Sequence, residues 1–260
     1  MRGRPDVPAR RSAIGTVLRH VARRFRQGRA ALPDASWRAW LRLIGTGIVA
    51  MFALMLLLRF AAERALDGSL HARERAILLW LGRESPLSFS TAVFLQTFGS
   101  DITLLVLVTL TAGIAAWARR PISALSIPLA FLVPDLVGRF GWSIWARARP
   151  DLLFQGIPSP GFHSFPSGHA SKTIAIYGLL TVLWIRASRT DAEKLLAGTV
   201  LAAIVSAVAV GRTAMGVHWP SDIIGGLIVG GTWLLLLAYG LRWERDLAGK
   251  RIHTGDRSPP

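Results

Sequence analysis

The stretch IGTGIVAMFALMLLL, residues 44–58, decides the fold, because it runs for fifteen residues without a charge. With its flanks it forms an apolar block over 43–60, close to the length of about 20 residues that a helix needs to cross a bilayer. Outward from it along the chain, similar blocks follow at 102–118, 122–145, 169–185, 195–210 and 223–241. The sequence therefore predicts an all-α integral membrane protein, a bundle of six transmembrane helices over residues 43–241.

The composition agrees with a membrane bundle. Of the 260 residues, 52% are hydrophobic and 18% are charged, whereas soluble globular chains average about 25% charged residues. These values exclude an ordinary soluble domain and a disordered chain. The absence of cysteine also excludes a disulfide scaffold and a zinc finger.

The net charge of +16 comes almost entirely from arginine. A strongly basic chain can indicate nucleic-acid binding, but eleven of these arginines lie in residues 1–43, directly before the first apolar block. A basic segment beside a membrane span is typical of the cytoplasmic side, where it meets anionic lipid. We therefore expect residues 1–42 to form an unordered cytoplasmic arm, and we expect no nucleic-acid partner.

Six crossings place both chain ends, including a tail at 242–260, on one side of the inner (plasma) membrane. The arginine-rich connections at 119–120 and 186–194 fall on that same side, which the positive-inside rule makes cytoplasmic. The segments 61–100, 146–166 and 211–221 then share the external or periplasmic side. The first of these mixes charged and apolar residues, so we expect an amphipathic or re-entrant helix after the first span.

Three clusters of polar residues lie in or next to these external segments. They are Arg147-Ala148-Arg149-Pro150, then Pro166-Ser167-Gly168-His169, and finally Arg212, His218 and Asp222. Two crossings separate His169 from His218, and none separates Arg149 from His169. The topology therefore predicts that all three clusters meet at one external site.

The residue types in these clusters suit a phosphate group. Arg149 and Arg212 offer planar, permanently charged forks that match phosphate oxygens. Ser167 and Gly168 open a helix whose first amides can bind an anion. The sequence shows no paired carboxylates arranged for magnesium, so we expect neither a metal nor another cofactor.

Two histidines complete a reaction centre. His218 and Asp222 are spaced i,i+4, so that the carboxylate can hold one ring nitrogen and leave the other free to attack. His169 can then protonate the leaving oxygen. This arrangement predicts phosphoryl transfer through a phosphohistidine.

The three clusters together resemble the three-part signature of the type 2 phosphatidic acid phosphatase family. The resemblance covers about residues 95–240 and implies the membrane branch of that family, with six spans and an external site. It implies that His218 is the nucleophile, Asp222 its partner and His169 the general acid. Phosphate would be bound by Arg149, Ser167, Gly168 and Arg212. The family acts without a metal on lipid phosphates and pyrophosphates.

Two positions depart from the family's pattern. Trp142 stands where the family has lysine, and Gly211 stands where it usually has serine. Arg139, one helical turn earlier, and Arg147 are the candidates to supply the missing charge at phosphate. Asp135, however, lies four residues before Arg139 and could pair with it inside the bilayer.

We expect a membrane phosphatase that removes phosphate from a lipid phosphate or diphosphate, with undecaprenyl diphosphate as the leading substrate. Phosphatidic acid, phosphatidylglycerophosphate and lipid A stay open as substrates. Three other functions also stay open: a lipid phosphotransferase that uses the same phosphohistidine, a non-catalytic lipid-phosphate binding or transport protein, and a vanadate-dependent peroxidase.

Overall fold

The computed structural model describes residues 13–65, 68–84, 87–150 and 163–244, and within them the chain is helical, with no strand. The nine helices of these described ranges are α1 (Ala13–Ala31), α2 (Asp34–Ala65), α3 (Gly68–Arg83), α4 (Phe89–Thr97), α5 (Asp101–Trp117), α6 (Pro121–Ile144), α7 (Gly168–Ala187), α8 (Asp191–Ala214) and α9 (Pro220–Gly240). The six predicted spans correspond in order to α2, α5, α6, α7, α8 and α9. The all-α fold is confirmed.

Five stretches of the described chain are long and apolar enough to cross a membrane. They are Asp34–Ala65, Phe89–Trp117, Pro121–Ile144, Asp191–Ala214 and Pro220–Glu244. The predicted fourth span, α7, is not among them. It carries Lys172 between Ser171 and Thr173, and all three side chains are buried. Its place inside the bundle explains this composition, because its polar groups face neighbouring helices and not lipid.

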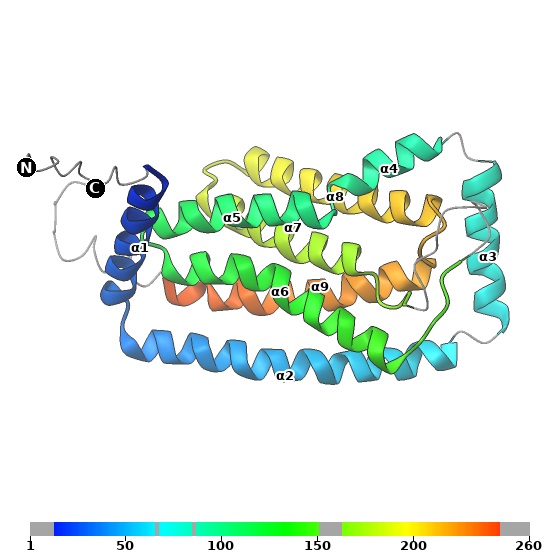
Figure 1. The fold of residues 1–260 in the computed structure, drawn as a ribbon, viewed down its shortest axis with the longest axis horizontal. Coiled ribbons are helices and arrows are strands. Elements are labelled where there is room, and N and C mark those ends of the chain that lie inside the picture. The colour runs from blue at the N-terminus through cyan, green and yellow to red at the C-terminus, as the bar shows by residue number, and fades with distance from the viewer. Residues whose placement is uncertain (1–12, 66–67, 85–86, 151–162, 245–260) are drawn as a thin grey trace, which may run out of the picture.

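Helix α7 is the centre of the bundle. It packs against α9, α8, α6 and α5, while α2 runs along α9 and α6 on the outside (Figure 1). Glycines let α7 and α9 approach closely: a Cβ at Gly226 would lie 2.5 Å from the carbonyl oxygen of Ser167. Small residues at such contacts are typical of helix packing in membranes.

The basic arm differs from the unordered segment that we expected. Its described part, residues 13–42, is helical and comprises α1 and the first turns of α2. On α1, Val21 and Phe25 pack against the core, and Arg24 Nε donates to the carbonyl oxygen of Trp117 at 2.9 Å. The arm is ordered because its apolar residues recur at helical spacing and have a surface of the bundle to cover.

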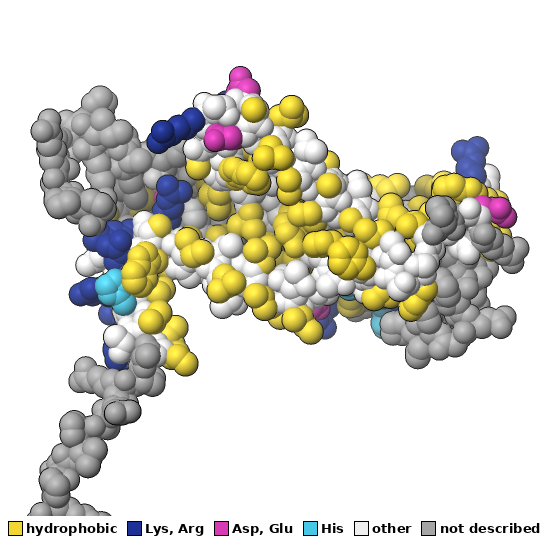
Figure 2. All heavy atoms as spheres, turned by 90° about the horizontal axis from the view of Figure 1, so that it is seen from above, with side chains coloured by type: hydrophobic (Ala, Val, Ile, Leu, Met, Phe, Trp, Pro, Cys, Tyr) yellow, Lys and Arg dark blue, Asp and Glu magenta, His cyan; other side chains and the backbone are white. Residues whose placement is uncertain are grey.

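The described part of the mixed segment 61–100 comprises the end of α2 and the helices α3 and α4. Helix α3 lies across one end of the bundle, opposite the end where α1 lies (Figure 1). Hydrophobic side chains cover the flank of the bundle between these ends, and most of the Lys and Arg side chains in this view gather at the α1 end (Figure 2). Several apolar helices with a hydrophobic flank are typical of a multi-pass membrane protein.

Candidate active site

The predicted site residues gather at the α3 end of the bundle. The C-terminal ends of α6 and α8 meet the N-terminal ends of α7 and α9 there (Figure 1). The segment after α6 supplies Arg147 and Arg149, and the segment before α7 supplies residues 163–167. Residues 151–162, between them, lie outside the described part of the chain.

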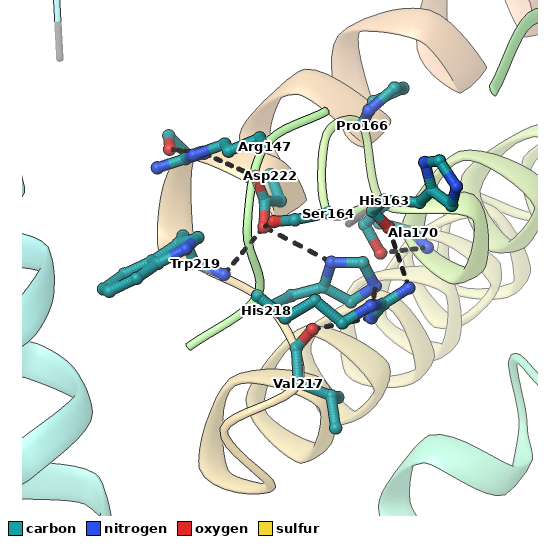
Figure 3. A network of polar contacts seen from close by, with 12 residues as sticks. Arg147, His163, Ser164, Pro166, Ala170, Val217, His218, Trp219 and Asp222 are labelled. Carbon is teal, nitrogen blue, oxygen red and sulfur yellow. Dashed lines mark hydrogen bonds and ion pairs between the residues drawn. The ribbon is translucent and has the colours of Figure 1, made fainter. Parts of the chain in front are cut away.

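His218 precedes α9 and faces a carboxylate one turn into that helix. Its Nδ1 lies 3.4 Å from Oδ2 of Asp222, and the backbone N–H of Trp219 donates to the same oxygen at 2.8 Å. Ser164 Oγ also donates to Oδ2, and Arg147 donates to Oδ1 (Figure 3). The carboxylate is therefore held from several sides, which fixes the orientation of the imidazole.

Arg149 lies beside the other nitrogen of that ring. Its Nη1 is 3.3 Å from His218 Nε2 and donates to the carbonyl oxygen of Val217 at 2.7 Å. Its Nη2 donates to the carbonyl oxygen of His163 at 2.9 Å. The Nε atom is buried and has no hydrogen-bond partner in the described ranges. A cation is thus positioned next to the nitrogen that is free to attack.

Arg212, in the last turn of α8, is oriented by α4. Its Nη1 donates to Oε1 of Gln96 at 2.7 Å, and its buried Nε also lacks a partner among the residues described. A Cβ on Gly211 would lie 2.7 Å from the carbonyl oxygen of Ala92. Glycine in place of the family's serine therefore allows α4 to approach and brings Gln96 onto Arg212.

The third part of the site is the N-terminus of α7. Ser167 is the N-cap and accepts from the N–H of Ala170 at 3.4 Å. Its own N–H donates to the carbonyl oxygen of Asp222 at 2.9 Å, which ties this turn to α9. His169 is half-buried, lies within electrostatic range of His218 and Arg212, and has no hydrogen-bond partner in the part of the chain described here. His169 and the two arginines thus lie within electrostatic range of His218.

The surroundings of His218 keep its ring neutral. The pKa of His218 is lowered to about 4: burial is the main cause, the hydrogen bond to Asp222 opposes the shift, and the charges of Arg212 and Arg149 add to it. A ring with this pKa is unprotonated at pH 7. Its Nε2 lone pair is therefore available for attack.

The two candidates for the missing lysine charge are engaged elsewhere. Arg147 forms ion pairs with Asp222 and with Glu74, at 2.9 Å in the second case, and lies behind the carboxylate (Figure 3). Arg139 pairs with Asp135 at 2.8 Å, as the spacing suggested, and 65% of its side chain is exposed. Within the described part of the chain, neither arginine forms a hydrogen bond or ion pair with His218 or the N-terminal turn of α7.

Trp142 supports the turn before α7 in place of that lysine. Its Nε1 donates to the carbonyl oxygen of Pro166 at 3.2 Å, and its ring would lie 3.7 Å from a Cβ at Gly168. It therefore lies against the loop that precedes His169.

Four residues that contact the site or lie next to it were not predicted from sequence. They are Glu74, Gln96, Ser164 and Lys172. Lys172 lies one turn after His169 and forms ion pairs with Asp101 and Asp135. A charge inside an apolar block needs a partner, and this signal could have identified Lys172. The other three carry no local sequence signal, because their partners are distant in the chain.

Comparisons with known proteins agree with this geometry. The PAP2 superfamily matches residues 123–246, which contain the three clusters. An undecaprenyl-diphosphatase of Sulfolobus acidocaldarius is 28% identical over 155 residues, which are 56% of this chain and 66% of that protein. A lipid A 1-phosphatase of Rhizobium etli is 35% identical over 102 residues, 35% of this chain and 39% of the relative. The matches thus span less than two thirds of either relative.

A solved structure has the same fold. A transmembrane PAP2-type phosphatidylglycerolphosphate phosphatase from Bacillus subtilis superimposes with a TM-score of 0.58 over 81% of this chain and 98% of that chain, at 20% identity. The arrangement of helices is therefore shared, although the identity is too low to carry a substrate. The region that forms the site, residues 123–246, is similar to the PAP2 superfamily.

Proposed function

We propose that this protein is a membrane lipid phosphatase that hydrolyses a lipid phosphate or diphosphate through a phosphohistidine at His218. The observation that carries the proposal is the position of His218: Asp222 holds its Nδ1, and its Nε2 faces Arg149. Lipid phosphatases among the relatives support the same reaction class.

In the first step, Nε2 of His218 attacks phosphorus and the bond from phosphorus to the leaving oxygen breaks. His169, protonated in the complex with the anionic substrate, gives its proton to that oxygen, so that the lipid leaves as an alcohol or a monophosphate. Asp222 stabilises the positive charge that the ring acquires. Arg149, Arg212 and the first amides of α7 stabilise the charge on the transferring phosphoryl oxygens.

In the second step, water replaces the histidine. His169, now neutral, takes a proton from water as the oxygen attacks phosphorus, and the bond between phosphorus and Nε2 breaks. Its electron pair returns to the ring, inorganic phosphate leaves, and the starting protonation states are restored. All charges in both steps are balanced by groups of the chain itself, so we propose that the reaction needs no metal.

For the substrate, we propose a polyisoprenyl diphosphate such as undecaprenyl diphosphate. The archaeal relative carries that activity in its name, and its match extends over 155 residues of this chain. The lipid A 1-phosphatase has a higher sequence identity to this chain than the archaeal relative, but over a shorter stretch. Lipid A is therefore the second substrate that we would test.

The experiment is phosphate release in EDTA by the detergent-purified protein. The panel contains undecaprenyl diphosphate, lipid A, phosphatidic acid and phosphatidylglycerophosphate, each assayed beside His218→Ala. We expect release that resists EDTA and is lost in the variant. Phosphate transferred to an added lipid alcohol without free phosphate would instead indicate a phosphotransferase, and no reaction with any lipid would favour a binding protein.

We further propose that the site faces the external or periplasmic side of the plasma membrane, and α1 the anionic lipid of the cytoplasmic leaflet. Helix α1, the link between α5 and α6, which includes Arg119 and Arg120, and the link between α7 and α8 lie at the end of the bundle away from the site (Figure 1). Exposed Ile14, Val17 and Leu18 accompany those arginines on α1, as in interfacial helices.

Because the chain has no cysteine, single cysteines can report the side directly. Ala72→Cys on α3 and Ala187→Cys at the end of α7 both replace exposed residues. In intact cells, a membrane-impermeant maleimide should label the first and spare the second. The reverse pattern would overturn the proposed orientation.

A further inference from the structure

Glu74 is a buried carboxylate on α3, outside the three clusters that carry the chemistry. Only 2% of its surface is exposed. Its two oxygens have separate partners: Oε2 accepts from Arg147 Nη2 at 2.9 Å, and Oε1 accepts from the backbone N–H of Ser221 at 2.8 Å. Both partners are close to Asp222: Ser221 precedes it in the chain, and Arg147 forms an ion pair with it.

The first contact connects Glu74 to the catalytic carboxylate through Arg147. The guanidinium donates from Nη1 to Oδ1 of Asp222 and from Nη2 to Glu74. All three side chains are at most 9% exposed, so water screens these charges little. One cation is thus shared between two carboxylates, and its pull on Asp222 is balanced by Glu74.

The second contact fixes the helix that carries Asp222. Pro220 is the first residue of α9, so the N–H of Ser221 is one of the amides that has no acceptor within the helix. Glu74 provides an acceptor from a different helix, and its negative charge favours the N-terminus of α9. Arg147 Nη1 also donates to Ser221 Oγ at 2.8 Å. Glu74 therefore holds the first turn of α9 directly at the N–H of Ser221 and indirectly through Arg147.

We propose that Glu74 is a positioning residue for the phosphohistidine reaction: through Arg147 and Ser221 it sets the charge and orientation of Asp222 beside His218. The inference rests on the proposed function, since it assigns Glu74 to the same centre. It makes α3, which lies across the end of the bundle, a part of the active site.

The consequence of losing Glu74 follows from charge. Without it, the full positive charge of Arg147 acts on Asp222 and, beyond it, on the imidazole. Asp222 then stabilises a cationic ring less well, which slows formation of the phosphoenzyme. Among the described residues, Glu74 forms no hydrogen bond or ion pair with Arg149, Arg212 or the turn before α7, so we expect phosphate binding to stay unchanged.

The test compares Glu74→Gln with Glu84→Gln in the full-length protein. Gln keeps the shape of the side chain and removes its charge, while Glu84 is an exposed residue just after α3. Three quantities are measured: kcat and KM for the lipid phosphate, the inhibition constant of inorganic phosphate, and the pH midpoint of His218 by histidine-selective 15N NMR in detergent.

For Glu74→Gln we expect kcat to fall roughly tenfold to a hundredfold, the range for hydrogen bonds to charged groups. KM and phosphate inhibition should remain within about twofold, and the His218 midpoint should move to lower pH, because an uncompensated Arg147 disfavours the protonated ring. Glu74→Asp should lie between wild type and Gln in kcat and midpoint, and Glu84→Gln should match wild type.

Two results would overturn the inference. One is a Glu74→Gln variant with the kcat and midpoint of Glu84→Gln. The other is a loss of kcat with weaker phosphate inhibition and an unchanged midpoint, which marks a merely structural residue. If Glu74→Gln does not fold, the pH midpoint of His218 is measured in Glu74→Asp. A midpoint equal to that of the wild type would contradict the proposed effect of Glu74 on His218. A wild-type protein that hydrolyses no lipid would refute the proposed function, while the midpoints would still test the role of Glu74.

Discussion

Oδ2 of Asp222 lies 3.4 Å from Nδ1 of His218, four residues earlier in the chain, and the two residues are 0% and 1% exposed. The turn that makes this contact runs from α8 to α9 and includes Gly216 at φ 66°, a backbone angle that favours glycine. Because Asp222 occupies Nδ1 of the buried imidazole, the nitrogen that can react is Nε2, which faces Arg149.

The buried position of His218 predicts an unusual titration. Because its pKa is lowered from 6.5 to about 4, mainly by burial, its ring should stay neutral down to roughly pH 4. Histidine-selective 15N NMR in detergent, assigned with His218→Asn, measures this midpoint. A midpoint near 6.5 would show that the ring is solvated.

The same shift predicts how stability depends on pH. Between pH 6.5 and 4 the unfolded chain protonates His218 while the folded protein does not, so the free energy of unfolding decreases as pH falls through this window. Above pH 6.5 His218 is neutral in both the folded and the unfolded protein, so this loss of stability is absent. Unfolding in detergent at several pH values should show a smaller pH dependence for His218→Asn than for wild type, and equal dependences would argue against the shift.

Close packing of α7 on α9 predicts a contrast between two adjacent glycines. A Cβ on Gly230 would clash with the backbone of Ser171 and lie 2.5 Å from Cγ2 of Ile174, whereas a Cβ on Gly231 meets nothing within 4 Å. Gly230→Ala should therefore destabilise the protein by about 1–3 kcal/mol, and Gly231→Ala should leave it unchanged. Thermal unfolding in one detergent checks both, and equal midpoints would contradict the packing.

Lys172 predicts a contrast between a buried and an exposed ion pair. Its side chain is 5% exposed, and it contacts Asp135 at 3.1 Å and also Asp101. Lys172→Met should cost about 1–3 kcal/mol, because Asp135 loses a charged partner within the bundle. Lys194→Met removes an exposed pair with Asp191 and should cost under about 1 kcal/mol. If the two variants unfold at the same temperature, Lys172 does not stabilise the bundle.

Arg212 predicts a loss of phosphate affinity. Its guanidinium is oriented by Gln96 at 2.7 Å and has a buried Nε without a partner within the described chain. Arg212→Gln should raise the inhibition constant of inorganic phosphate roughly tenfold to a hundredfold, as expected for a charge-assisted hydrogen bond. Arg242→Gln, at the far end of α9, serves as the control. Equal inhibition constants would remove Arg212 from the phosphate site.

Much of this fold could be predicted from the sequence, because long apolar blocks identify membrane helices without knowledge of their neighbours. The positions of α2, α5, α6, α8 and α9 followed directly. Helix α7 followed as well, although Lys172 makes it too polar to stand out by composition alone. The order of α1 did not follow, because its arginines suggested a solvated arm and its apolar residues acquire a partner only in the folded bundle.

The residues of the candidate site also fall into those that a sequence pattern indicates and those that only the structure reveals. His169, His218 and Asp222 could be predicted because they lie at fixed spacings at the ends of helices. Arg147 was a candidate for phosphate, and only the structure shows it between Asp222 and Glu74. Glu74 and Gln96 are 73 and 116 residues from the arginines that they contact. Contacts over such distances depend on how α3 and α4 pack, which no local pattern records.

The central claim is that His218 carries the phosphoryl group, and trapping the phosphoenzyme tests it most directly. The protein is mixed with lipid phosphate labelled with 32P, stopped in alkali, in which phosphohistidine survives, and separated from lipid. We predict that label stays on the wild-type protein, is lost in mild acid, maps to the peptide containing His218, and is absent from His218→Asn. Label on another residue, or equal label on the variant, would contradict the account.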